Sequence, residues 1–211
     1  MNEYEPELKI REELVDGVAP WMWIAPDSGA WQGPHEEWPH HKEKAEKHVT
    51  DWRICVQAGG NQGMYPRLYS EMFDHVYTFE PDPLNFHCLV NNCQKDNIYK
   101  MQAALGETTG LAKVNRHSMD NTGMHTVSTE GDCFVPMITI DSLNLPYCGL
   151  FQLDLERYEI HALRGALKTI ERCKPVIQCE CGNDEILELL KPFGYDAVDS
   201  YAADTFYKAI W

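Results

Sequence analysis

Three acidic side chains stand where they could carry out chemistry. Asp154 and Glu156 lie two residues apart in the segment FQLDLE, and Glu180 ends the apolar segment VIQCE. Residues two apart on a strand share a face, so Asp154 and Glu156 can converge where their strand ends. Such carboxylates could remove a proton from a hydroxyl group or hold a divalent cation. Alternatively, one acid caps the following helix and another binds an amino group. His125, in the loop segment NTGMHTV, is the other candidate base, and no metal ligands are assigned.

A glycine-rich turn follows the first apolar segment of the chain's main part. The sequence WRICVQAGGNQG places Gly59, Gly60 and Gly63 around Asn61, directly after Gln57. Glycine permits positive φ angles and close approach of the backbone to a ligand. The spacing does not match the GxGxxG fingerprint of dinucleotide-binding proteins. S-adenosylmethionine (SAM) is the other cofactor class that fits a turn of this kind.

The next two predicted strands end in residues suited to bind an adenosine. Glu80, followed by Pro81, ends YTFEPD, roughly 20 residues after the glycine turn, where a carboxylate can accept hydrogen bonds from ribose hydroxyls. Gln102 and Ala103 follow in MQAALG, where a small side chain leaves room for an adenine ring and the amide can meet its polar edge. Alternatively, Glu80 is a solvated acid at the end of a strand, and the small side chain of Ala103 reflects ordinary close packing.

Short apolar runs alternate with helical patterns from Trp52 onward, which is typical of βαβ units and a mostly parallel sheet. The predicted strands are 53–57, 75–79, 99–103, 150–154 and 176–181. The predicted helices are 39–48, 83–94, 156–172 and 185–192. The stretch from 110 to 142 suggests extra strands or a loop over the sheet edge, and the C-terminus reads as an antiparallel hairpin.

Composition narrows the function classes. The 211 residues carry a net charge of -15, which disfavours nucleic acid as a partner because phosphate backbones attract basic surfaces. There is no apolar run of about 18 residues and no signal-peptide pattern, so we expect a cytoplasmic protein without a membrane span. The eight cysteines, scattered through predicted strands and helices, are interpreted as reduced thiols.

Six segments in order resemble the FkbM-type SAM-dependent methyltransferases: VQAGGNQG, YTFEPDPLNFHCLVNN, AALGE, NTG, ITIDSL and FQLDLERYEIHALRGA. The resemblance covers residues 52–211 and implies a Rossmann-like class I methyltransferase fold. That fold is an α/β arrangement with a seven-stranded, mostly parallel sheet, an antiparallel last strand and helices on both faces. It also implies SAM as cofactor and O-methylation of a small molecule or sugar. The chain departs from the family pattern at Gln57, Gly60, Gln152 and Arg157, where Asp, Ala, Lys and Gly are usual.

The predicted division is an N-terminal extension, 1–50, and a SAM-binding methyltransferase domain, 51–211. The extension is rich in Trp, Pro, His and charge, and it either covers the substrate or packs on the sheet. Its tryptophans are Trp21, Trp23, Trp31 and Trp38, and its histidines His35, His40 and His41 resemble a metal cluster only superficially.

Two other functions stay open from the sequence. The segment NLPY, residues 144–147, is similar to a signature of RNA adenine methyltransferases, which hold a flipped base. The glutamines at 57 and 152 instead suggest a methyltransferase-like module that acts by binding a partner.

Overall fold

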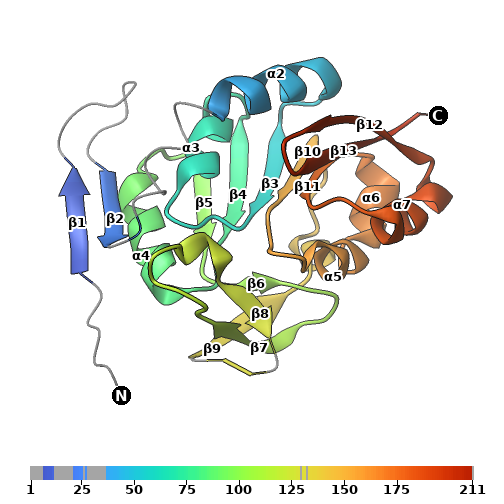
Figure 1. Cartoon of the computed structure of the whole chain (residues 1–211). Helices are drawn as coiled ribbons and strands as arrows, with labels where there is room; N and C mark the ends of the chain where they lie inside the picture. Colours follow the sequence, from blue (N-terminus) through green and yellow to red (C-terminus); the bar gives the residue numbers. More distant parts are fainter. Residues whose placement is uncertain are drawn as a thin grey trace.

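A mixed sheet forms the centre of the protein in this computed structural model, which describes residues 7–11, 21–25, 27, 37–128, 130–131 and 133–210 (Figure 1). Within the described residues it has seven strands in the order β12, β13, β11, β10, β3, β4, β5. Their bounds are β3 (Ile54–Ala58), β4 (His75–Phe79), β5 (Ile98–Met101), β10 (Leu150–Leu153), β11 (Val176–Glu180), β12 (Tyr195–Tyr201) and β13 (Asp204–Ala209). The first five in chain order pair in parallel, and β13 is antiparallel to β11 and β12. The predicted α/β class is thereby confirmed.

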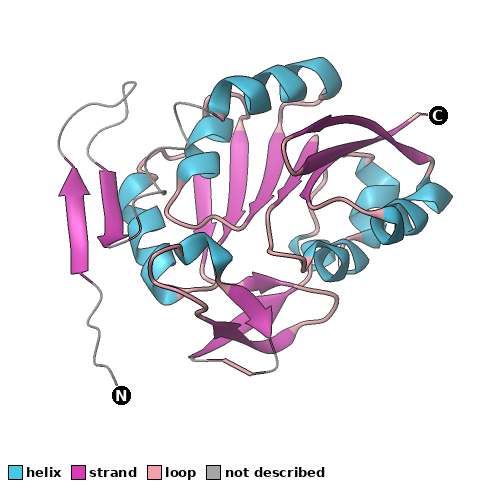
Figure 2. Ribbon diagram, viewed as in Figure 1, coloured by secondary structure: helices cyan, strands magenta, loops and turns pink. Residues whose placement is uncertain are grey.

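Helices cover both faces of the sheet (Figure 2). On β3, Ile54, Val56 and Ala58 belong to the core beneath α5, α6 and α7, whereas Cys55 belongs to the core beneath α2 and α3. This alternation follows from the two-residue period of a strand, and burial on both sides explains why the segment reads as a continuous apolar run. The helices are α2 (Trp38–His48), α3 (Met64–Ser70), α4 (Pro83–Asn92), α5 (Glu159–Arg164), α6 (Leu167–Cys173) and α7 (Asp184–Leu190), with 3₁₀ turns η2 (Thr122–Met124), η3 (Ile140–Leu143) and η4 (Lys191–Phe193).

A second sheet and a hairpin lie outside this central layer. The second sheet has the order β6 (Ala104–Leu105), β9 (Cys133–Ile138), β7 (Gly110–Asn115), β8 (Thr126–Ser128), which confirms the extra strands predicted in this stretch. The hairpin of β1 (Glu7–Arg11) and β2 (Trp21–Ala25) was not predicted, and it lies beside α4 in Figure 1. Asn92 joins the two, because its side chain bonds both the amide and the carbonyl of Met22 at 2.7 Å.

The predicted continuous helix over 156–172 is wrong. Glu156 and Arg157 have φ angles of 52° and 74°, outside the helical region, so α5 starts only at Glu159. A Cβ on Gly165 would lie 2.0 Å from the carbonyl oxygen of Gly106, so the chain approaches the helix closely there and helical structure is interrupted. Asp141 then caps α6 by accepting the amide of Thr169 at 2.8 Å. Tertiary contacts therefore divide the predicted helix into α5 and α6.

Smaller differences concern where elements end. β3 continues to Ala58, which places Gln57 inside the strand, and β5 stops at Met101, which places Gln102 and Ala103 after it. The C-terminal hairpin, β12 and β13, is confirmed. No helix in the described part of the chain has the length and apolar character needed to cross a membrane.

Candidate functional site

The glycine turn joins the ends of three neighbouring strands. The amides of Gly59 and Gly60 both donate to the carbonyl of Phe79 at the end of β4, at 3.1 and 2.9 Å. Gly59 has a φ of 79°, and a Cβ there would lie 1.8 Å from the carbonyl oxygen of Asp154. A Cβ on Gly60 would lie 2.4 Å from Cδ1 of Leu89. Contacts within the protein are thus the first reason why glycine is required at these positions. The sequence analysis had attributed this requirement to a ligand.

Glu80 holds this turn against the loop that follows β4. Its two carboxylate oxygens accept the backbone amides of Asn61 and Asp82, each at 2.7 Å. The side chain is buried, and burial raises the pKa of Glu80 to about 8, against the lowering effect of the two amide bonds. Each oxygen still has a lone pair for a further donor, so the carboxylate remains able to bind hydroxyl groups.

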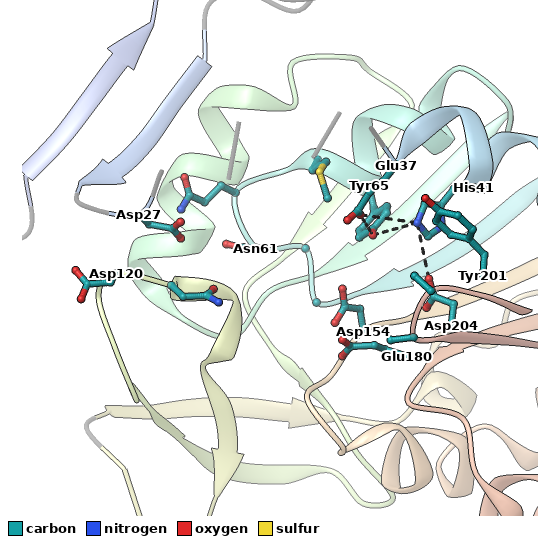
Figure 3. A pocket seen from close by; sticks show the side chains of 17 residues that line it. Asp27, Glu37, His41, Asn61, Tyr65, Asp120, Asp154, Glu180, Tyr201 and Asp204 are labelled. Carbon is teal, nitrogen blue, oxygen red and sulfur yellow. Dashed lines mark hydrogen bonds and ion pairs between the residues drawn. The ribbon is translucent and has the colours of Figure 1, made fainter. Parts of the chain in front are cut away.

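Two cavities open at the carboxyl ends of these strands. The larger, of about 460 Å³, runs from Asp27 and Asp120 past the glycine turn to α2 and the turn between β12 and β13 (Figure 3). The smaller, of about 130 Å³, is lined by Glu80, Pro81 and His125 among others. Both are lined by Gly59, Asn61, Asp154 and Glu180. This shared wall is where a ligand in one cavity would meet a ligand in the other.

Asp154 and Glu180 face each other in that wall (Figure 3). The shared strand face expected for Asp154 and Glu156 is wrong, because β10 ends at Leu153 and Glu156 has a φ of 52°. Ligand atoms of Asp154, Glu156 and Glu180 lie within 4.8 Å of one another, and this is the one metal-capable group found in the described part of the chain. Burial, followed by the charge of Glu180, raises the pKa of Asp154 well above its usual range. Oε2 of Glu180 is buried without a hydrogen-bond partner. The pair therefore favours a bound proton over two negative charges, and a cation held between the two groups would stabilise their ionised form.

His41 of α2 lies at the far end of the larger cavity, buried among polar groups. Its Nδ1 accepts from the amide nitrogen of Gln178 at 2.7 Å, so its Nε2 carries the proton and points toward the Tyr65 hydroxyl at 3.3 Å. Tyr65 in turn donates to Glu37 at 2.9 Å, and Asp204 lies 3.7 Å from Nε2 of His41. Burial lowers the pKa of His41 to about 4, so the ring is a neutral hydrogen-bond donor near pH 7.

A row of glutamines explains how His41 is held. Gln57, Gln152 and Gln178 occupy the same register position on β3, β10 and β11, and all three are buried. Gln57 accepts from Thr78 at 2.5 Å and donates to the carbonyl of Gly59 at 3.1 Å. Gln178 accepts from Tyr69 at 2.9 Å through its oxygen, which leaves its nitrogen for His41. The departures from the family pattern at 57 and 152 thus form part of a polar row inside the sheet.

Asp204→Asn is expected to stabilise the protein increasingly as the pH rises from about 4 to about 7. Burial raises the pKa of Asp204 from 3.8 to about 7, so in this window the folded chain binds a proton that the unfolded chain has released. The wild type therefore loses stability with rising pH at this residue, whereas asparagine does not titrate. We expect a relative gain on the order of 2 kcal/mol at pH 8 compared with pH 4, measured by urea unfolding. A variant-to-wild-type difference that stays constant over the window would contradict the buried position of this carboxylate.

The remaining predicted site residues fall into two groups. Pro81 and His125 line the smaller cavity, and His125 donates from Nε2 to the carbonyl of Ser118 at 3.1 Å while its Nδ1 lies 3.2 Å from Asp82. Nε2 is engaged by the Ser118 carbonyl and Nδ1 faces the Asp82 carboxylate without a hydrogen bond, so the geometry favours a role in holding the loop. The predicted residues that line neither cavity are Gln57, Gly63, Gln102 and Ala103.

Asp82 ties the same loop to α4. It caps that helix through the amides of Leu84 and Asn85, and Arg116 bonds its Oδ2 through Nε at 2.6 Å. The nearby His125 ring and the hydrogen bonds from Arg116 outweigh burial and hold the pKa of Asp82 well below its usual range. Sequence reasoning missed this residue, although its place before Pro83 is a capping signal.

The N-terminal region contributes acids and a histidine to the site. Its described lining residues are Asp27, Glu37 and His41, whereas Trp21 is buried near the guanidinium of Arg67 and Trp38 packs on the α2–α3 core. Trp31 and His35 lie outside the described residues. For the described tryptophans, which line neither cavity, the packing interpretation applies. Asp27 accepts both the amide and the hydroxyl of Thr122, at 2.9 and 2.8 Å.

The NLPY segment lies at the opposite edge of the sheet. Asn144 and Tyr147 precede β10, and the guanidinium of Arg53, just before β3, lies 3.3 Å from the centre of the Tyr147 ring. Both strands begin there, whereas the cavities lie where they end. A base held by this segment would therefore not reach the site, which removes the structural support for the RNA adenine methyltransferase alternative.

A glycine turn after β3, an acid after β4 and another after β10 lie at the carboxyl ends of parallel strands, which is where ligands bind in Rossmann-like folds. The family model of the methyltransferase FkbM domain matches residues 57–197. The chain therefore belongs to the FkbM methyltransferase family, which confirms the resemblance seen in the sequence. Comparison with curated proteins gives no match.

Solved structures support the fold. A methyltransferase FkbM from Methylobacillus flagellatus KT aligns with a TM-score of 0.53 and 15% identity over 79% of this chain and 50% of that one. Trm5b from Pyrococcus abyssi aligns with a TM-score of 0.52 and 10% identity over 94% of this chain and 55% of that one. The chain thus spans about half the length of each of these proteins.

Proposed function

We propose that this chain is a SAM-dependent methyltransferase that methylates a hydroxyl group of a small molecule or sugar. The observation that carries the proposal is the meeting of the glycine turn, Glu80 and Asp154 at two cavities that share one wall. Family membership supports methyl transfer, and the shared wall gives a place where donor and acceptor would come together.

The residues present fit SAM. Glu80 offers free lone pairs to ribose hydroxyls, and the buried Oδ1 of Asn85, in the same cavity, lacks a partner and can accept a further hydrogen bond. The Gln57 side chain points into the sheet and carries no charge. Asp154, which contacts the glycine turn, is therefore the residue that would bind the ammonium group of the methionine part of SAM. A cation there relieves the repulsion between Asp154 and Glu180.

Glu180 is the residue best placed to take the acceptor's proton. When bound, SAM would supply a methyl group on a positively charged sulfur, and the acceptor oxygen would attack the methyl carbon in line with that sulfur, which is the leaving group. The new bond joins oxygen to the methyl carbon, the bonding pair of the broken C–S bond stays on sulfur, and the hydroxyl proton passes to a carboxylate. Oε2 of Glu180 is buried and unpartnered, and it lies in the wall that both cavities share.

Isotope-labelled SAM tests the proposal directly. Transfer of labelled methyl groups to a panel of sugars and hydroxylated small molecules is expected, and the product should be an ether that resists alkaline hydrolysis. Label recovered only on nitrogen, or as a base-labile ester, would contradict O-methylation. Label that enters RNA in preference to every small molecule would overturn the substrate class.

A further inference from the structure

We infer that the methyl acceptor carries a positively charged amine in addition to its hydroxyl group, and that Glu37 and Asp204 bind this amine. The inference rests on the proposed function and names the substrate class of the same site. It concerns the end of the larger cavity between α2 and the β12–β13 turn, where His41, Tyr65 and Tyr201 also lie (Figure 3).

The first argument is charge. The carboxylates that line the larger cavity are Asp27, Glu37, Asp120, Asp154, Glu180 and Asp204, and no Lys or Arg is among its described lining residues. The residues outside the described ranges contain no Lys or Arg. The lysines of α2 are paired outside the cavity: Asp199 accepts from Lys44 and Lys47 at 2.6 and 2.7 Å, and Lys42 lies 3.8 Å from Glu46. SAM brings one net positive charge, fewer than the carboxylates present, and a second cation beside Asp204 would favour the ionised form of that group over the protonated form that burial favours.

The second argument is the supply of unpartnered acceptors. Gln62 lines the Asp27 end of the same cavity, is 1% exposed, and its Oε1 has no hydrogen-bond partner, so a ligand that extends along the cavity would meet it. The amide orientation is fixed, because the Thr122 hydroxyl donates to Asp27 and must therefore accept from Nε2 of Gln62. Oε2 of Glu180 is a second buried acceptor without a partner. A ligand that completes these contacts must be rich in hydrogen-bond donors, which a hydroxylated amine is.

The third argument is the geometry around Asp204. Nε2 of His41, fixed as a donor by Gln178, lies 3.7 Å from Oδ2 of Asp204, beyond hydrogen-bond length. The carboxylate therefore keeps capacity for a stronger donor on its cavity side. The rings of Tyr65 and Tyr201, which line the same end, add favourable contacts for a cation.

The test uses calorimetry on the full chain saturated with S-adenosylhomocysteine. Two sets of compounds are titrated, each with an amine, a neutral and an acidic member in that order. The first set is glucosamine, N-acetylglucosamine and glucuronate, and the second is tyramine, 4-ethylphenol and 4-hydroxyphenylacetate. In at least one set the amine is expected to bind about tenfold or more tightly than its neutral and acidic counterparts. Asp204→Asn and Glu37→Gln should each remove this preference, whereas Glu188→Gln, at an exposed site on α7, should keep it.

Each other result overturns the inference. Neutral or acidic members that bind as tightly as the amines, or amines that fail to bind in both sets, contradict it. Neutral members that bind only when Mg²⁺ is added would show that Asp154, Glu156 and Glu180 hold a metal instead. Failure of S-adenosylhomocysteine and SAM to bind at all would count against the proposed function, which keeps the two claims separable.

Discussion

Glu180→Gln is expected to reduce methyl transfer by about 100- to 10,000-fold while SAM binding stays nearly unchanged. General base catalysis contributes rate factors of about this size, and glutamine keeps the shape of the side chain but cannot take up the proton. Because Glu180 repels Asp154, its neutralisation should leave the free energy of unfolding equal or higher.

The measurement combines single-turnover transfer with SAM titration of the same preparations. Asp154→Asn is the informative comparison, because it should lose donor affinity as well as transfer. A Glu180→Gln enzyme with wild-type turnover would show that the proton leaves by another route. A parallel loss of SAM binding would instead assign Glu180 to the donor.

Gly59→Ala is expected to destabilise the fold by about 3 kcal/mol or more and to abolish SAM binding. Alanine at a φ of 79° is strained, and its Cβ would collide with the Asp154 carbonyl, which is part of the backbone and cannot move aside cheaply. The strand ends would have to separate, which displaces Asn61 and Asp154 together.

Chemical unfolding and calorimetric titration check this prediction. Gly110→Ala is the matched control, since a Cβ there meets nothing within 4 Å, and it should change stability by less than about 0.5 kcal/mol. If Gly59→Ala were as stable as the control, the close contact between the glycine turn and the end of β10 would be wrong.

Sequence reasoning anticipated that the glycine turn, Glu80 and Asp154 lie together, because the signals are local. The glycine turn, Glu80 and Asp154 each follow an apolar strand segment, and the carboxyl ends of parallel strands meet at one edge of the sheet. The predicted adenine contacts, Gln102 and Ala103, depended on small side chains after a strand. That signal is weak, and the structure places neither residue in a cavity.

The end of the larger cavity between α2 and the β12–β13 turn could not be predicted, because its residues come from segments far apart in the sequence. His41 lies on α2, Tyr65 on α3, and Asp204 opens β13, and only the packing of these elements joins them. The glutamine row is similar: Gln57 and Gln152 read as isolated departures and Gln178 was not singled out, until the register aligns all three. The break of the helix predicted over 156–172 also depends on a distant contact, the Gly106 backbone.

Titration of the wild-type protein with SAM, with Glu80→Ala alongside, tests the central claim most directly. Glu80 binds two backbone amides and has lone pairs left for ribose hydroxyls, so its loss should weaken saturable SAM binding by about tenfold to a hundredfold. Saturable one-site binding that weakens in the variant is the predicted result. Absence of SAM binding to the folded wild type would contradict the methyltransferase account and favour a module that acts by binding a partner.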